Sequence, residues 1–101
     1  MTPIRPSFNR AGYIATLRST KIREIDGLAI LVLIAEKCDD NRMVPRRHFT
    51  APGIARLTGI ERTTAYRRLA KLRLKSLITV TRNKRTSCYQ LAPETKLQKF
   101  L

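Results

Sequence analysis

The sequence predicts a mainly helical α+β domain that ends in a β-hairpin. Three segments repeat their apolar residues with helical spacing: Lys21–Lys37, Thr50–Leu57 and Arg62–Leu74. Two later segments, Leu77–Thr81 and Cys88–Leu91, are rich in β-branched and alternating residues, as strands are. At 101 residues the chain has room for one domain, which we place at residues 21–92.

Residues 1–20 are expected to form a basic arm that precedes this domain. Pro3 and Pro6 favour an extended chain, although Ala11–Arg18 has the spacing for one or two helical turns. The arm lacks the apolar segment of a signal peptide. The longest apolar run of the sequence, Leu28–Ala35, has eight residues, against the ~20 that a membrane-spanning helix needs. We therefore expect a cytoplasmic protein.

The first predicted helix, Lys21–Lys37, has the strongest helical pattern. Thr20 is suited to cap its N-terminus, and Glu24 and Asp26 suit the positive end of the helix dipole. From Leu28 to Ala35 the helix is apolar on every side, so it must be covered all round. A small monomer has little material for this, and we predict a dimer interface made by Leu28, Leu31, Ile34 and, from the C-terminal tail, Phe100. The alternative is that other segments of the same chain cover the helix.

The segment that follows this helix is expected to be extended. Cys38–Asn41 has the composition of a turn, and Arg42–Phe49 comes after it. Pro45 lacks a backbone N–H, which confines it to an edge strand. We therefore predict a short edge strand around Met43–Val44.

Two closely spaced helices come next. Thr50 suits the N-cap of the first helix, and Pro52 falls in its first turn, where a missing N–H is harmless. The residues expected to face inward are Ile54, Ala55 and Leu57. Gly59 can adopt a positive φ, so the turn Thr58–Ile60 separates this helix from the second one, Arg62–Leu74.

A polar and basic connection, Arg82–Ser87, joins the two predicted strands and is expected to form a charged hairpin tip. Pro93 ends the hairpin. Residues 93–101 form a short tail with its apolar residues on one side, and these are a second candidate for a dimer contact: Leu97, Phe100 and Leu101.

The chain is strongly basic, and the excess lies in its second half. It has 21 Lys and Arg against 7 Asp and Glu, a formal net charge of +14. Between Asn41 and Ala92 there are thirteen basic residues and one acidic residue, Glu61. Self-repulsion of this size destabilises a compact chain, so a polyanionic partner is expected. Nucleic acid is the first candidate; a membrane surface, an acidic protein and an ordinary solvated surface are the alternatives.

The order of helix, short strand, helix, tight turn, helix and hairpin carries a resemblance. Ile54–Leu69 (IARLTGIERTTAYRRL) is similar to the helix-turn-helix of bacterial winged-helix regulators, and Leu72–Ile78 resembles the passage into their wing. MarR-like and related plasmid or phage regulators share this layout, and the similarity covers Thr50–Leu91. The resemblance implies a winged helix-turn-helix that binds double-stranded DNA. One departure is Glu61, where such motifs often have a Ser or Asp cap.

The second helix of the pair has one apolar side and one polar side. Ala65, Leu69 and Leu72 lie within about 60° of one another at 3.6 residues per turn and are expected to face the core. An α-helix fits the major groove of DNA, so the opposite side is the candidate recognition surface. Its residues are Arg62, Thr63, Thr64, Tyr66, Arg67 and Lys71, beside the small Ala70. We expect Arg67 to bind guanine O6 and N7, Thr63 to contact a thymine methyl group or a phosphate, and Tyr66 a phosphate.

The hairpin and the segment before the helix pair supply further basic residues. The expected wing residues are Arg82, Asn83, Lys84 and Arg85, which in the similar regulators reach the minor groove or the backbone. Arg82 and Arg85 are the better candidates for a narrow minor groove, whose negative potential attracts arginine. The expected phosphate contacts are Arg46, Arg47 and Thr50, with Arg5, Arg10 and Arg18 of the arm as further candidates. His48, the sole histidine, is expected to be a surface or capping residue.

The sequence argues against catalysis, a metal and a cofactor. Glu61 is alone in the basic half, so the carboxylate cluster that a nuclease needs for its metal is missing. Cys38 and Cys88 form no C-x-x-C pattern, and with one histidine they would need carboxylates to complete a zinc site. We expect both cysteines to be reduced and buried. The four glycines are scattered and form no phosphate-cradling loop.

We therefore expect a sequence-specific DNA-binding protein that acts as a dimer at the nucleoid. A small transcriptional repressor is the first interpretation, and a plasmid partition or replication protein is the second. RNA binding and a protein-interaction module are the alternatives from other classes. RNA readers commonly stack bases on aromatic rings, and the polar side of the helix has one such ring, Tyr66. A DNA-binding dimer would place its recognition helices in successive major grooves, about 34–36 Å apart.

Overall fold

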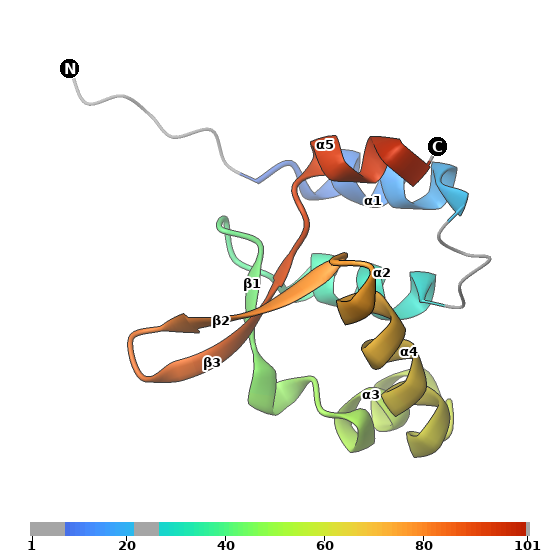
Figure 1. Ribbon diagram of the computed structural model, residues 1–101, viewed down its shortest axis with the longest axis vertical. Coiled ribbons are helices and arrows are strands. Elements are labelled where there is room, and N and C mark those ends of the chain that lie inside the picture. The colour runs from blue at the N-terminus through green and yellow to red at the C-terminus, as the bar shows by residue number, and fades with distance from the viewer. Residues whose placement is uncertain (1–7, 22–26, 101) are drawn as a thin grey trace.

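The computed structural model describes residues 8–21 and 27–100, which form a mainly helical α+β domain with a three-stranded antiparallel sheet. In chain order the elements are α1 (Arg10–Ser19), α2 (Leu28–Lys37), β1 (Met43–Pro45), the 3₁₀ turn η2 (Arg46–His48), α3 (Ala51–Thr58), α4 (Arg62–Leu74), β2 (Ile78–Asn83), β3 (Thr86–Leu91), α5 (Glu94–Leu97) and the 3₁₀ turn η3 (Gln98–Phe100). Figure 1 shows α1 and α5 at one end of the molecule, α3 and α4 at the other, and α2 with the sheet between them. The predicted class is confirmed, and the arrangement is compatible with the expected winged-helix layout.

The sheet has the strand order β1-β3-β2, and both pairs are antiparallel. β1 is a short edge strand that ends at Pro45, as predicted. The hairpin strands are longer than expected, because Asn83 pairs with Thr86 and leaves a two-residue turn in which Lys84 has φ 60°. Arg82 pairs with Ser87 and so belongs to a strand, not to the tip. The polarity of these residues suggested a loop, but a hairpin that projects into solvent tolerates polar residues on both faces.

The helical turns expected over Ala11–Arg18 are confirmed, but the expected arm is wrong from Arg10 onward, because α1 packs into the core. Tyr13 and Leu17 are fully buried, and the Tyr13 hydroxyl donates to the carbonyl of Ala92. Arg10 donates through Nε to the carbonyl of Ala35 (2.9 Å) and through Nη2 to that of Cys38 (2.7 Å), which satisfies two carbonyls at the C-terminal end of α2. Arg5 lies outside the described residues. The Arg10 side chain, expected as a phosphate contact, instead binds backbone carbonyls of its own chain.

The helix expected over Lys21–Lys37 begins only at Leu28. Thr20 is the C-cap of α1, with an extended backbone and a hydroxyl that donates to the carbonyl of Leu17 (2.7 Å). The N-cap of α2 is Gly27. A Cβ at that position would lie 2.5 Å from Cδ2 of Leu72, so the glycine permits a close approach between α2 and α4. Glu24 and Asp26, expected near the start of this helix, lie outside the described residues.

The predicted dimer face of α2 is wrong for Leu31 and Ile34, since both are buried within the chain itself. α1, α3 and β3 pack against α2 and cover these sides. Phe100, half-buried, packs against the same core, and Leu97 of the tail is completely buried. Leu28 is half-buried and remains on the outer side of the helix. The alternative, coverage by the same chain, therefore holds for most of α2.

Two further expectations concern single residues. Cys38 and Cys88 are free and buried, as expected, and burial raises the pKa of the Cys38 thiol. Leu57, expected to face inward, is 56% exposed, while Ile54 is completely buried and Ala55 half-buried. The short helix α3 is covered mainly by α4, and this cover does not reach Leu57.

Among the described residues, no helix has the length and apolar character of a membrane span.

Tyr13→Phe tests whether the α1 contact stabilises the domain. Burial raises the pKa of Tyr13, so its hydroxyl remains a donor at neutral pH, and Phe leaves the buried carbonyl of Ala92 without it. We expect a loss of about 1–3 kcal/mol in the free energy of unfolding, measured by urea denaturation. Tyr66→Phe is the control, because Tyr66 is 69% exposed and should leave stability unchanged. Equal stabilities for the two variants would contradict a role for this hydrogen bond.

Candidate nucleic-acid interface

Local signals set the relation between α3 and α4. The Thr50 side chain caps α3 by accepting a hydrogen bond from the N–H of Gly53 (3.2 Å), and Pro52 occupies the first turn. Gly59 ends α3 in the left-handed region (φ 80°), where its N–H donates to the carbonyl of Ala55 (2.8 Å). α4 begins three residues later and packs against α3. The predicted cap, turn and helix are all confirmed.

The structure places α4 in the predicted rotation. Its inward residues Ala65, Leu69 and Leu72 are buried. The outward residues predicted for recognition are exposed, except for the half-buried Thr64: Arg62, Thr63, Tyr66, Arg67 and Lys71. Exposed Ala70 lies among them and leaves the helix surface low at that point. The outward side of α4 is therefore a basic and hydroxyl-bearing surface that a flat or convex partner can approach closely.

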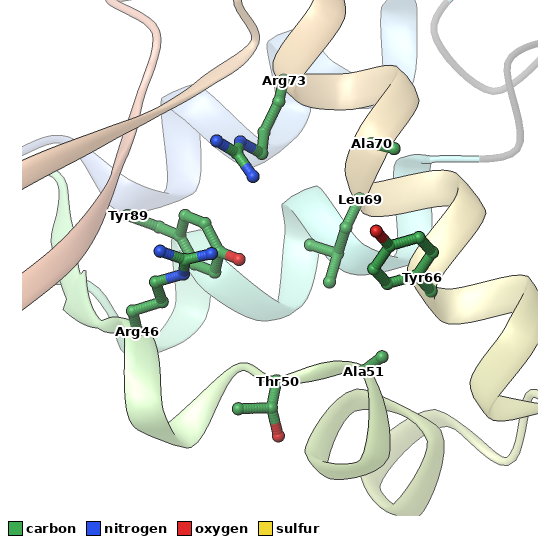
Figure 2. Close-up of a pocket in the computed structure, with 8 residues that line it drawn as sticks. All are labelled: Arg46, Thr50, Ala51, Tyr66, Leu69, Ala70, Arg73 and Tyr89. Carbon is green, nitrogen blue, oxygen red and sulfur yellow. The ribbon is translucent and has the colours of Figure 1, made fainter.

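A cleft separates this side of α4 from the sheet. It has a volume of about 210 Å³ and is lined by Arg46, Thr50, Ala51, Tyr66, Leu69, Ala70, Arg73 and Tyr89. In Figure 2 the guanidinium of Arg46 lies over the ring of Tyr89, and Arg73 extends from α4 toward the same space. The Cζ atom of Arg46 is 5.5 Å from the centroid of that ring. Tyr66 presents its hydroxyl toward the cleft, whereas the Thr50 hydroxyl faces α3.

The cleft has the chemistry of an anion site. No acidic side chain is among the residues that line it, and two guanidinium groups, from η2 and from α4, border it. A guanidinium fork matches the oxygens of a phosphate in geometry and charge. The stacked ring of Tyr89 orients Arg46 by a cation–π contact. The cleft therefore offers a phosphate group donors from Arg46, Arg73 and Tyr66.

Arg73 and Tyr89 were absent from the predicted site. Arg73 follows Tyr66 by seven residues, or about two helical turns, so helical spacing alone could have added it to the polar side of α4. Tyr89 carries no such signal, because the pairing of β1 with β3 brings it beside the segment that contains Arg46.

The hairpin approaches the same region. Arg85, Thr86 and Ser87 line an open groove of about 420 Å³ together with Arg46, Arg47 and Thr50. The predicted phosphate contacts and one predicted wing residue are thus brought together, although they are far apart in sequence. Arg82 and Lys84 are exposed on the hairpin. His48 is exposed and accepts from Nε of Arg47 (3.3 Å), in agreement with a surface role.

We call the combined surface of outward α4, the cleft and the hairpin groove the basic face. It shares Arg46 and Thr50 between cleft and groove, so the two are continuous. Among the described residues, no group of three His, Cys, Asp or Glu side chains could hold a metal ion. Comparison with protein-family models, curated proteins and solved structures found no match to this chain. The chemistry of the basic face is therefore argued from its own residues.

Glu61→Ser should stabilise the N-terminus of α4. Glu61 occupies the N-cap position, but its side chain makes no cap hydrogen bond. A serine there can accept from an N–H of the first turn, and we expect about 0.5–2 kcal/mol more stability than in the control Glu61→Ala. Both variants lose the same charge, so their difference in thermal denaturation reports the cap alone. Equal melting temperatures would show that the start of α4 is not limited by its cap.

Proposed function

We propose that the protein is a winged helix-turn-helix that binds double-stranded DNA with sequence specificity, through the basic face. The observation that carries this proposal is the rotation of α4. Its inward apolar residues are buried while Arg62, Thr63 and Arg67 are exposed next to a cleft bordered by two arginines. An α-helix with its side chains fits the major groove. α3 and α4 with their short turn correspond to the helix pair that the sequence resemblance implies.

The parts of the basic face suit different parts of a DNA duplex. The N-terminal half of α4 enters the groove in helix-turn-helix proteins, so Thr63 and Arg67 are assigned to base edges. The cleft between Arg46 and Arg73 is assigned to a backbone phosphate at the groove rim. Arg85 and Lys84 on the hairpin are assigned to the adjacent backbone or minor groove, where arginine is attracted by negative potential.

The arrangement of the binding sites on DNA would distinguish two physiological roles. A small transcriptional repressor that binds one or two palindromic half-sites is the first reading. A plasmid partition or replication protein that covers an array of direct repeats is the second. Footprinting on DNA selected from a random pool distinguishes the two, because it returns motif, symmetry and spacing together.

Competition between duplex DNA and structured RNA of equal charge tests the class of nucleic acid. A single exposed aromatic ring, Tyr66, lines the cleft from α4, whereas sequence-specific RNA readers commonly stack several bases. We expect DNA to displace RNA in a gel-shift assay. Tighter binding of RNA, or binding of an acidic peptide in preference to both, would overturn the proposal.

Salt dependence tests the electrostatic part of the proposal. A basic face that neutralises six to ten phosphates should lose roughly 10³–10⁵ in affinity between 50 and 200 mM salt, since bound counterions are released. Fluorescence anisotropy with a labelled duplex measures this slope. A flat dependence would mean that the arginines of the basic face do not contact phosphates.

Arg67→Ala and Arg73→Ala separate base recognition from phosphate binding on one helix. Arg67→Ala should cost about 1–3 kcal/mol on the preferred sequence and relax preference at one base pair. Arg73→Ala should weaken binding to all sequences alike and reduce the salt slope by about one. Lys99→Ala, which removes the same charge from exposed η3 at the far end of the molecule, is the control and should change neither. Equal, sequence-independent losses at positions 67 and 73 would assign Arg67 to the backbone.

A further inference from the structure

The outer side of α2 carries an apolar stripe that remains partly exposed. Leu28, Val32 and Leu33 are half-buried and Ala29 is exposed. Leu28 and Val32 are four residues apart, as are Ala29 and Leu33, so the two pairs lie side by side on one face of the helix. Together with Arg18, Glu36 and Thr58 they line an open groove of about 400 Å³. A continuous apolar stripe rimmed by polar residues is typical of an interaction surface.

The two ends of this groove carry opposite charges. Arg10, in the first turn of α1, donates to the carbonyls of Ala35 and Cys38 at the end of α2, so the two helices run antiparallel. Arg18, in the last turn of α1, therefore lies beside the start of α2, near Leu28. Glu36 lies eight residues further along, about 12 Å at 1.5 Å per residue. Among the described residues that line it, the groove therefore has a cation at one end, an anion at the other and mainly apolar side chains between them.

We propose that this groove binds a second copy of the chain across a twofold axis, with the two α2 helices antiparallel. A twofold interface brings the same patch of both copies together. Rotation by 180° exchanges the ends of the groove, so Arg18 of each copy faces Glu36 of the other. The exposed Ala29 allows the helices to approach closely. The charge pattern of the groove is therefore self-complementary. A groove that binds an acidic peptide or a nucleic acid would not require this pattern.

The interface leaves the basic face open. None of the residues that line the α2 groove lines the cleft beside Arg73 or the hairpin groove. The stripe also holds Glu36, one of the few acids of a chain with a net charge of +14, so two copies meet where their mutual repulsion is small. The proposal does not rest on DNA binding, and it replaces Leu31 and Ile34 by Ala29, Val32 and Leu33 as interface residues.

Mixing two charge-reversed variants tests the pairing directly. In Arg18→Glu alone, the introduced acid faces the partner's Glu36, and in Glu36→Arg alone two cations face each other. We expect the dimer dissociation constant, measured by sedimentation at low salt, to rise about tenfold in each variant. An equimolar mixture forms a mixed dimer with opposite charges at both contacts and should return to within about threefold of the wild type. A mixture no tighter than either variant would overturn the proposed pairing.

Val32→Glu tests the apolar part of the interface. A carboxylate in the centre of the stripe should abolish the dimer, whereas Val80→Glu, on a 38% exposed valine of β2 outside the groove, should leave it intact. Circular dichroism checks that both variants fold. Dimerisation of Val32→Glu, or a wild-type chain that is monomeric at every concentration reached, would overturn the proposal. Should Val32→Glu fail to fold, the mixing experiment decides, because its substitutions lie at exposed positions.

Discussion

The burial of one apolar side sets the rotation of α4, on which the functional surface depends. α4 is a very basic helix held by the buried Ala65, Leu69 and Leu72, and at the start of α2 Gly27 leaves room for Leu72. Any side chain at position 27 would displace it, since even a Cβ would lie 2.5 Å from Cδ2 of Leu72. A rotation of α4 about its axis would bury Arg67, which costs several kcal/mol for an unpaired charge. The position of the arginines is therefore a consequence of core packing.

The basic face concentrates like charges, which do not stabilise the folded state by themselves. Arg46 and Arg73 border one cleft that contains no acidic side chain, so their repulsion is relieved only by water, by the ring of Tyr89 or by a bound anion. Core burial across α1, α2 and the sheet must offset this repulsion. A bound phosphate would convert the repulsion into charge-assisted hydrogen bonds.

Signals between residues close in sequence made the helix pair predictable. The features that depend on tertiary packing could not be predicted in this way. The N-cap at Thr50, the left-handed Gly59 and the bounds of α4 follow from residues within one turn of each other, and all appear as predicted. The start of α2 did not, because Gly27 is needed for its approach to Leu72, and no local pattern shows that contact. Arg73 was within reach of the helical period, whereas Tyr89 joins the cleft only through strand pairing.

The error on the dimer face of α2 has one cause, the role given to α1. With residues 1–20 treated as an arm, too little chain remained to cover an all-apolar helix, and a dimer seemed required at Leu31 and Ile34. α1 supplies that cover through Tyr13 and Leu17, and the same packing sets Arg18 beside the start of α2. What stays uncovered is a narrow stripe with Arg18 and Glu36 at its ends. A twofold pair built on that stripe would hold α2 of each copy in place, and through Gly27 and Leu72 it would also fix how the two α4 helices lie relative to each other.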